Sequence, residues 1–232
     1  MKYFLIAGEA SGDLHASNLM KGLLAEDPEA DFRFWGGEKM ASVGGTLLHH
    51  YKEGAVMGVG DVFSKAGMLL HNIKECKDNI LSYAPDVVIL IDYPGFNFRV
   101  AEWAHNKGFK VYYYIAPKVW ASREGRIKKL KAFVDKLFIV FPFEIPYFTK
   151  KGIDFIYKGN PLIDAIDNSV ALKESREEFL RRNSLPDSPV IALMAGSRTG
   201  EISSMMPVFM EFADKMHALP EYADYQFIVA AA

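Results

Sequence analysis

The sequence predicts an α/β fold: a Rossmann-like doubly wound parallel sheet, followed by the first part of a second domain of the same kind. Short runs of branched and aromatic apolar residues alternate with longer segments of helical periodicity, the order typical of parallel strands joined by crossover helices. One run, VVILI at residues 87–91, is apolar at every position, as expected of a strand covered on both faces.

The first 164 residues form a domain of usual size. We expect strands at residues 3–7, 31–35, 86–91, 110–115, 136–141 and 154–157. The expected helices cover residues 14–25, 62–83, 98–106, 123–134 and 143–150. In the longest helix, apolar residues recur at positions 62, 66, 69, 73, 76 and 80, which places them on one face.

Residues 165–232 begin a second α/β pattern. We expect a charged helix at 171–182, a turn between two prolines, and then a strand at 190–194, a helix at 202–218 and a strand at 225–229. A single strand–helix–strand unit is too small to bury a core of its own. We therefore expect a linker and the incomplete start of a second domain, in a protein that continues beyond residue 232.

The bulk composition argues against several classes of protein. The chain has 27 Lys and Arg against 29 Asp and Glu, and its net charge of −2 argues against nucleic-acid binding by bulk electrostatics. A single cysteine, Cys76, provides no disulfide framework, which fits a reducing cytoplasm. The chain starts directly with a strand, so we expect no signal peptide, and no apolar run approaches the ~20 residues that span a bilayer.

Asp92 is the first candidate for chemistry. It follows the buried strand of residues 86–91, and Pro94 and Gly95 break the strand directly after it. The carboxyl ends of strands line the ligand crevice of an open α/β sheet, and an apolar wall there can raise the pKa of a carboxyl group toward that of a base. The alternative, a cap on a helix starting near Asn97, is weaker because an Asx cap lies closer to its helix.

The loop GEASGD at residues 8–13 joins the first strand to the first helix. Its two glycines permit a tight turn, but their spacing is not that of a dinucleotide-binding loop. The acids Glu9 and Asp13 suit sugar hydroxyls better than pyrophosphate. The alternative is a plain turn in which Ser11 or Asp13 caps the helix.

Two further segments are candidates for anion binding. In AGSRTGE, residues 195–201, Ser197 and Arg198 can hold a phosphate at a helix N-terminus. In APKVWASREGRIKKLK, residues 116–131, Lys and Arg residues lie beside Trp120 just past a strand end, which suits an anionic ligand or membrane surface. The alternative for such a run is a solvated face.

The helix expected at 62–83 carries more apolar residues than one face needs. Phe63, Leu70 and Leu81 lie about a quarter-turn from the core stripe, and Met68 points to the opposite side. A wide buried face is the commoner outcome for such a helix. The alternative is an exposed patch that meets lipid or an acyl chain.

Eight segments together resemble the lipid-A-disaccharide synthases, a bacterial family of inverting glycosyltransferases. They are GEASGD (8–13), WGGEKM (35–40), AVMGV (55–59), IDYPGFN (91–97), YIAPKVWA (114–121), FPFE (141–144), GNPLID (159–164) and AGSR (195–198), in family order. The resemblance implies the GT-B fold, with an acceptor-side N-terminal domain at residues 1–164. Residues 165–232 would then be the linker and the start of a C-terminal nucleotide-sugar-binding domain.

The resemblance also implies a reaction and its partners. A 2,3-diacylglucosamine passes from its UDP derivative to 2,3-diacylglucosamine 1-phosphate, which forms the lipid A disaccharide and releases UDP. The enzyme would be cytoplasmic and peripheral to the inner face of the inner membrane, and a homodimer is left open. We expect no metal and no other cofactor, because cations and helix dipoles can stabilise the leaving group.

Site residues follow from the same resemblance. Asp92 falls at the position of the candidate general base, which takes the proton of the acceptor 6-hydroxyl as that oxygen attacks the anomeric carbon. Glu9 is expected to contact a sugar or support the site, and Arg198 to meet the donor phosphate. The other expected substrate contacts are Gly8, Ser11, Met57, Asn97, Lys118, Trp120, Arg123 and Ser197. The expected acyl or membrane contacts are Phe63, Met68 and Leu70.

Two alternatives remain open from the sequence. One is another sugar-nucleotide enzyme of the same fold, such as an epimerase or a polyprenol-linked transferase. The other is a non-catalytic lipid-binding half-domain. Because most of the family's nucleotide-binding region lies in the later second domain, we expect little or no transferase activity from residues 1–232 alone.

Overall fold

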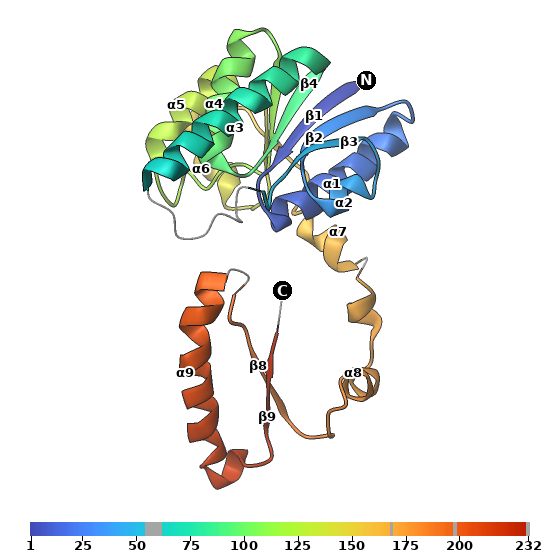
Figure 1. Ribbon diagram of the computed structural model, residues 1–232, viewed down its shortest axis with the longest axis vertical. Helices are drawn as coiled ribbons and strands as arrows, with labels where there is room; N and C mark the ends of the chain where they lie inside the picture. The colour runs from blue at the N-terminus through green and yellow to red at the C-terminus, as the bar shows by residue number, and fades with distance from the viewer. Residues whose placement is uncertain (54–61, 168, 197–198, 231–232) are drawn as a thin grey trace. The chain divides into compact units, whose positions relative to one another are not determined.

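The computed structural model describes residues 1–53, 62–167, 169–196 and 199–230. The chain divides into two compact units, Met1–Asn168 and Ser169–Ala232 (Figure 1). The described residues of the first unit contain a seven-stranded sheet, and those of the second a two-stranded sheet. Every strand pair in both sheets is parallel, which confirms the α/β class that the sequence predicts.

The strand order of the first sheet is β3-β2-β1-β4-β5-β6-β7. The strands are β1 (Lys2–Ala7), β2 (Asp31–Gly36), β3 (Thr46–His50), β4 (Val87–Ile91), β5 (Lys110–Tyr114), β6 (Lys136–Ile139) and β7 (Ile156–Tyr157). The helices are α1 (Ala10–Glu26), α2 (Glu38–Ala41), α3 (Val62–Tyr83), α4 (Pro94–Asn106), α5 (Ile127–Phe133), α6 (Glu144–Lys151) and α7 (Leu162–Asp167). The chain proceeds outward from β1 to β3 and then returns to β4 beside β1, so the strand order reverses between β1 and β4.

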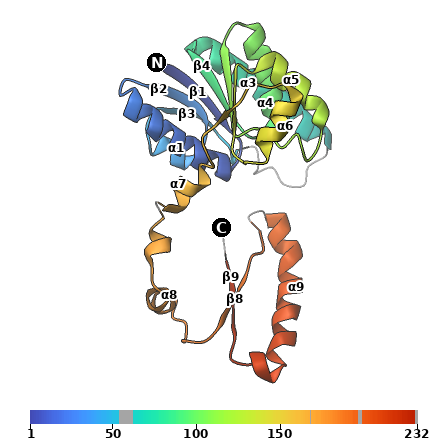
Figure 2. The ribbon, with the colours of Figure 1, turned by 180° about the vertical axis from the view of Figure 1, so that it is seen from behind.

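Helices cover both faces of this sheet. In β1, Phe4 and Ile6 face one apolar cluster and Tyr3 and Leu5 face another, because successive side chains of a strand point to opposite faces. The first cluster takes its helical residues from α3, α4, α5 and α6, and the second from α1 and α2. Figures 1 and 2 show α3, α4 and α5 on one side of the strands and α1 and α2 on the other. This two-sided burial explains the continuous apolar run of β4.

The structure differs from the sequence prediction mainly where elements are short or begin early. The prediction missed the single-turn helix α2 and the edge strand β3. Helix α1 begins at Ala10 rather than residue 14, and α4 begins at Pro94 rather than residue 98. In both cases a turn-forming residue lies inside the first helical turn: Gly12 in α1 and Pro94 itself in α4, where proline costs no hydrogen bond.

The second unit contains α8 (Arg176–Arg182), β8 (Val190–Leu193), α9 (Thr199–His217) and β9 (Gln226–Val229). Ser175 and Glu178 form a reciprocal capping box at the start of α8. Helix α9 packs on β9 through Phe212 and His217, whose rings meet Phe227 edge-on. None of the residues of α9 is buried. The assignment of this unit to the start of a nucleotide-sugar-binding domain remains a prediction.

Candidate active site

The loops after β1 and β4 leave the sheet side by side. Ala7, the last residue of β1, pairs in register with Ile91, the last residue of β4. The residues that follow them, Gly8 and Asp92, therefore lie at the same edge of the sheet. This edge is the point where the strand order reverses, and ligands of open α/β sheets bind in the crevice at such a point.

A cavity of about 210 Å³ lies at this edge. It contains three of the site residues expected from the sequence, namely Ser11, Asp92 and Lys118. The full lining is Ser11, Gly12, His15, Ile91, Asp92, Ile115, Lys118, Val140, Phe141, Asn160 and Leu162. The start of α1 and the segments after β4, β5, β6 and β7 thus share one cavity, which we call the Asp92 cleft.

Two opposing influences set the pKa of the half-buried Asp92 carboxyl group. Burial and then the nearby Glu9 carboxylate raise its pKa above the ordinary value, whereas the Lys118 ammonium and the backbone N–H of Tyr93 lower it. The raising influences are larger, so the net direction is upward. A carboxylate with a raised pKa is a better proton acceptor than an ordinary one. The cleft therefore holds a group suited to general-base chemistry.

The alternative of Asp92 as a helix cap is wrong. The N-cap residue of α4 is Tyr93, and no side chain forms a cap hydrogen bond there. Asp92 lies one residue further out, and its side chain lines the cleft. The early start of α4 thus brings the helix closer to Asp92 than expected without using the carboxylate as its cap.

Asp13 is a cap, but not of its own helix. Its side chain is buried, and its carboxylate accepts hydrogen bonds from the backbone N–H groups of Gly37 (2.9 Å), Lys39 (3.0 Å) and Met40 (3.1 Å). These donors belong to the first turn of α2 and the residue before it. The expected contact with sugar hydroxyls is therefore wrong for this residue, and the N-cap position of α1 belongs to Glu9.

The packing of the Tyr93 ring leaves no room for a side chain at Gly8. A Cβ atom on Gly8 would lie 2.4 Å from carbons of the Tyr93 ring, which covers this residue. Glu9 is exposed, and its charge raises the pKa of both Asp92 and Tyr93. Glu9 therefore lies beside the cleft, at the start of α1.

Asn97 faces inward. Its side chain is fully buried, and its amide nitrogen donates to the carbonyl oxygens of Asp92 (2.8 Å) and Ile91 (3.3 Å). The Tyr113 hydroxyl donates to the same Asp92 carbonyl at 2.6 Å. These contacts give Asn97 a place in the support of the turn at Asp92, behind the surface of the cleft.

Trp120 is tied to a buried acid that the sequence analysis did not single out. Its indole N–H donates to Glu144 at 3.0 Å, and the Glu144 carboxylate also accepts from the backbone N–H groups of Val140 (3.1 Å) and Phe141 (3.0 Å). Glu144 is fully buried. Glu144 therefore links two walls of the Asp92 cleft. One is the segment that contains Lys118 and Trp120, and the other is the segment that follows β6. The only signal in the sequence was an acid within the aromatic run FPFE.

His15 is a second residue that the sequence analysis missed. It lines the cleft, and its Nδ1 atom is buried without a hydrogen-bond partner among the described residues. Burial lowers the pKa of the imidazole, which is therefore neutral at pH 7. The available signal was its spacing, since His15 lies one helical turn after Ser11 and so shares its face of α1.

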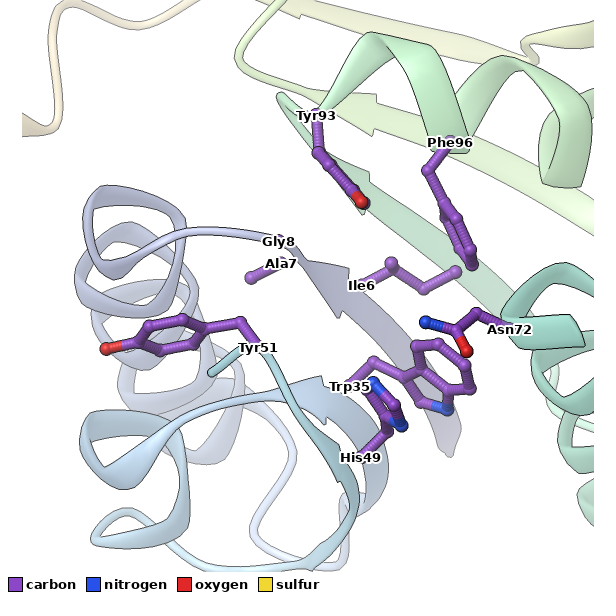
Figure 3. A pocket seen from close by; sticks show the side chains of 9 residues that line it. All are labelled: Ile6, Ala7, Gly8, Trp35, His49, Tyr51, Asn72, Tyr93 and Phe96. Atoms are coloured by element: carbon purple, nitrogen blue, oxygen red, sulfur yellow. The ribbon is translucent and has the colours of Figure 1, made fainter. Parts of the chain in front are cut away.

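A second, smaller pocket of about 50 Å³ lies on the other side of the same loops. Tyr93 and Phe96 enter it from one side and Trp35 and His49 from the opposite side (Figure 3). The Trp35 and His49 rings stack at a centroid distance of 4.1 Å, and the Tyr93 and Phe96 rings at 5.4 Å. Consecutive residues thus serve different cavities, with Asp92 in the cleft and Tyr93 in this aromatic pocket.

Other residues expected at the site either do not line the Asp92 cleft or lie outside the described residues. Arg123 is exposed and does not line the Asp92 cleft. Met57, Ser197 and Arg198 lie outside the described residues, as does the side chain of Phe63.

The apolar surface of α3 is partly exposed. Leu70 is 65% exposed and Leu81 50%, while Met68 is half-buried. The expectation of a wide buried face is therefore wrong for the two leucines. Among the described helices, none combines the length and apolar character needed to cross a bilayer.

Comparison with solved structures finds the same architecture in sugar-nucleotide enzymes. The UDP-GlcNAc 2-epimerase of Methanocaldococcus jannaschii, solved with UDP-GlcNAc and UDP, matches with a TM-score of 0.66 at 14% identity, over 100% of this chain and 66% of that one. The UDP-GlcNAc 2-epimerase of Neisseria meningitidis matches with a TM-score of 0.61 at 14% identity, over 99% of this chain and 65% of that one. At this identity the likeness concerns the fold alone.

Comparison with related sequences is more specific. The lipid-A-disaccharide synthase of Geobacter metallireducens is 41% identical over 232 residues, which are 100% of this chain and 59% of the relative. That of Myxococcus xanthus is 35% identical over 217 residues, 94% of this chain and 56% of the relative. The chain therefore spans less than two thirds of the length of these relatives.

The family model described as lipid-A-disaccharide synthetase matches residues 3–232. The match includes both loops of the strand-order reversal and the walls of the Asp92 cleft. Because this family model matches nearly the whole chain and a relative of the family is 41% identical over all 232 residues, the chain belongs to the lipid-A-disaccharide synthase family.

Proposed function

We propose that the complete natural protein containing this chain transfers 2,3-diacylglucosamine from its UDP derivative to 2,3-diacylglucosamine 1-phosphate. The observation that carries the proposal is the Asp92 carboxylate, half-buried in a cleft at the strand-order reversal, in a chain of this family. The product is a disaccharide, and UDP is released.

Asp92 acts as the general base in this proposal. Its carboxylate takes the proton of the acceptor 6-hydroxyl while that oxygen forms a bond to the anomeric carbon of the donor. The bond from the anomeric carbon to the UDP oxygen breaks in the same step, so the configuration inverts. A general base placed in this way contributes about 10²- to 10⁴-fold to the rate.

Cationic and acidic neighbours complete the acceptor side. Lys118 lines the cleft, and its ammonium group suits the 1-phosphate of the acceptor. Its charge also favours the ionised form of Asp92, since it opposes the rise in the pKa of that carboxyl group caused by burial and Glu9. Glu9 is proposed to bind a sugar hydroxyl beside the cleft. Ser197 and Arg198 remain sequence-based candidates for the donor phosphate.

The exposed surface of α3 at Leu70 is proposed to meet the acyl chains or the membrane surface at the inner face of the inner membrane. Leu70 is the described residue that supports this, because it is 65% exposed although large and apolar. Phe63 and Met68 remain the sequence-based candidates for the same contact. Sedimentation with vesicles of anionic phospholipid tests the contact: Leu70→Ser should reduce the bound fraction. Equal binding of this variant and wild type would contradict it.

The reaction itself is tested by two incubations of the complete protein with the UDP-linked acylated sugar. With the acylated sugar 1-phosphate present, mass spectrometry should detect the disaccharide and stoichiometric UDP. Without it, the donor should remain unchanged. Conversion of the donor to a 2-epimer in the absence of acceptor would instead assign the protein to the epimerase class, whose fold it shares.

A further inference from the structure

The turn that contains Asp92 has an unfavourable backbone conformation. Asp92 and Tyr93 are consecutive residues with positive φ angles, 42° and 45°. Neither is glycine, and a side chain in the left-handed region costs roughly 1–3 kcal/mol when the surroundings do not favour it. Two such residues in a row persist only where other contacts fix them.

Two buried side chains fix the carbonyl group of Asp92. The Tyr113 hydroxyl donates to it at 2.6 Å and the Asn97 amide at 2.8 Å. Both side chains are fully buried. Tyr113 lies on β5, in register with Leu90 of the neighbouring strand β4, so the sheet itself sets its position. The carbonyl is thus held from a strand and from a helix at once.

The next residue is fixed by packing. The Tyr93 ring lies over Gly8 and stacks on Phe96, and the Phe96 ring in turn meets Trp35 (Figure 3). With its carbonyl bonded and the following ring enclosed, the turn holds Asp92 in the lining of the cleft, where Lys118 acts on its carboxyl group.

We infer that Tyr113, together with Asn97, is a positioning residue that holds the left-handed turn and thereby aims the Asp92 carboxylate into the cleft. The inference about geometry stands on these contacts; the expected effect on the reaction rests on the proposed role of Asp92 as the base. Tyr113 keeps its proton in the working pH range, because burial and the charge of Asp92 raise the pKa of its hydroxyl well above the ordinary value.

Tyr113→Phe is the informative variant, because it removes one hydroxyl and keeps the ring in the core. Tyr112→Phe is the matched control, since Tyr112 packs on the opposite face of the sheet and contacts Phe138 and Lys136 instead. In the complete protein, Tyr113→Phe should lower kcat about 10- to 100-fold, the range that a misplaced catalytic group produces, with KM within about twofold. Tyr112→Phe should leave both constants unchanged. An Asn97→Leu variant removes the second donor and should lower kcat in the same way.

The second readout needs no substrate. The carboxyl carbon of Asp92 is followed by NMR as pH changes, in wild type and in both tyrosine variants of the 232-residue chain. Freeing the turn admits water to the carboxylate, so the pKa of Asp92 should fall toward its ordinary value in Tyr113→Phe and stay raised in Tyr112→Phe. The other groups near the carboxylate are Glu9, His15, Tyr93 and Lys118, and all are retained in both variants.

The two readouts separate the inference from the proposed function. An unchanged Asp92 titration in Tyr113→Phe, confirmed as folded by circular dichroism, would overturn the positioning role. A shifted titration with unchanged kcat would also overturn it. A shifted titration in a protein that transfers no sugar even as wild type would refute the proposed function and leave the geometry of the turn intact.

Discussion

The surroundings of Asp92 disfavour its ionised carboxylate, and its backbone conformation is unfavourable as well. Its carboxylate is half-buried, lies near the carboxylate of Glu9 and follows a strand of five buried apolar residues. Its backbone is left-handed as well. Burial and the Glu9 charge raise the pKa of the carboxyl group and so favour proton acceptance, and the left-handed backbone costs folding free energy. The proposed role of Asp92 as general base would account for these unfavourable features.

The first prediction concerns stability and pH. A carboxyl group whose pKa is raised in the folded protein contributes most favourably below its unfolded pKa, and that contribution is lost as the pH rises through the folded pKa. Asp92→Asn, which carries no charge, should therefore raise the thermal midpoint at pH 7, and its advantage should vanish below about pH 4. Calorimetry at both pH values checks this. A lower midpoint at pH 7 would show that the ionised carboxylate stabilises the fold.

The second prediction concerns Gly8. An alanine here would bring its Cβ atom to 2.4 Å from the Tyr93 ring, so the ring must move. We expect Gly8→Ala to destabilise the chain by about 1–3 kcal/mol in urea unfolding. Gly22→Ala is the control with the opposite sign: Gly22 lies in α1 with nothing within 4 Å of a new Cβ atom, and alanine there should stabilise by about 0.5–1 kcal/mol. Equal effects at both sites would contradict the packing of Tyr93 on Gly8.

At the scale of single elements, long-range contacts explain what the sequence could and could not predict. Strand β4 and helix α3 were predictable, because a continuous apolar run and a six-residue apolar stripe are local signals. Helix α2 is one turn long and depends on the Asp13 carboxylate, which lies 24 residues before Gly37 in the chain. Strand β3 exists through its pairing with β2. Neither contact can be recognised from the residues that neighbour α2 or β3 in the sequence.

The site residues likewise fall into those that a local sequence pattern predicts and those that depend on long-range contacts. Asp92 could be predicted because it ends a buried strand, and Lys118 because it follows the next one. The roles of Asn97, Tyr113 and Glu144 depend on which loops adjoin in the folded sheet. A single sequence does not contain that information in any local pattern.

The third prediction tests the link that Glu144 makes between two cleft walls. A glutamine offers one acceptor oxygen in place of two and points an amide toward a donor. Glu144→Gln should therefore destabilise the chain by about 2–3 kcal/mol in urea unfolding, since buried donors lose a charged partner. Glu124→Gln, which removes an exposed ion pair with Lys151 nearby, should change stability by less than about 1 kcal/mol. A similar small loss for both variants would refute the buried link.

At the scale of the whole molecule, the two units carry different parts of the proposed activity. The first unit holds the complete Asp92 cleft. The second unit contains one strand–helix–strand motif in its described residues, and the chain spans 59% of the length of the Geobacter metallireducens relative. We therefore propose that donor binding also needs the part of the relatives' length that this chain does not span.

The fourth prediction follows from this division. Residues 1–232 alone should show little or no transfer of radiolabelled acylated sugar, because general-base chemistry without donor binding lacks the reacting partner. The complete natural protein should turn over under the same conditions. Turnover by the 232-residue chain equal to that of the complete protein would show that the donor site lies within these residues.

The central claim, that the Asp92 carboxylate takes the proton of the acceptor hydroxyl, is tested most directly by the transfer rate of Asp92→Asn in the complete protein. We predict that kcat falls about 10²- to 10⁴-fold while the circular dichroism spectrum and thermal midpoint show a folded protein. A kcat within about threefold of wild type would contradict the account, since so small a loss is below the contribution of a general base.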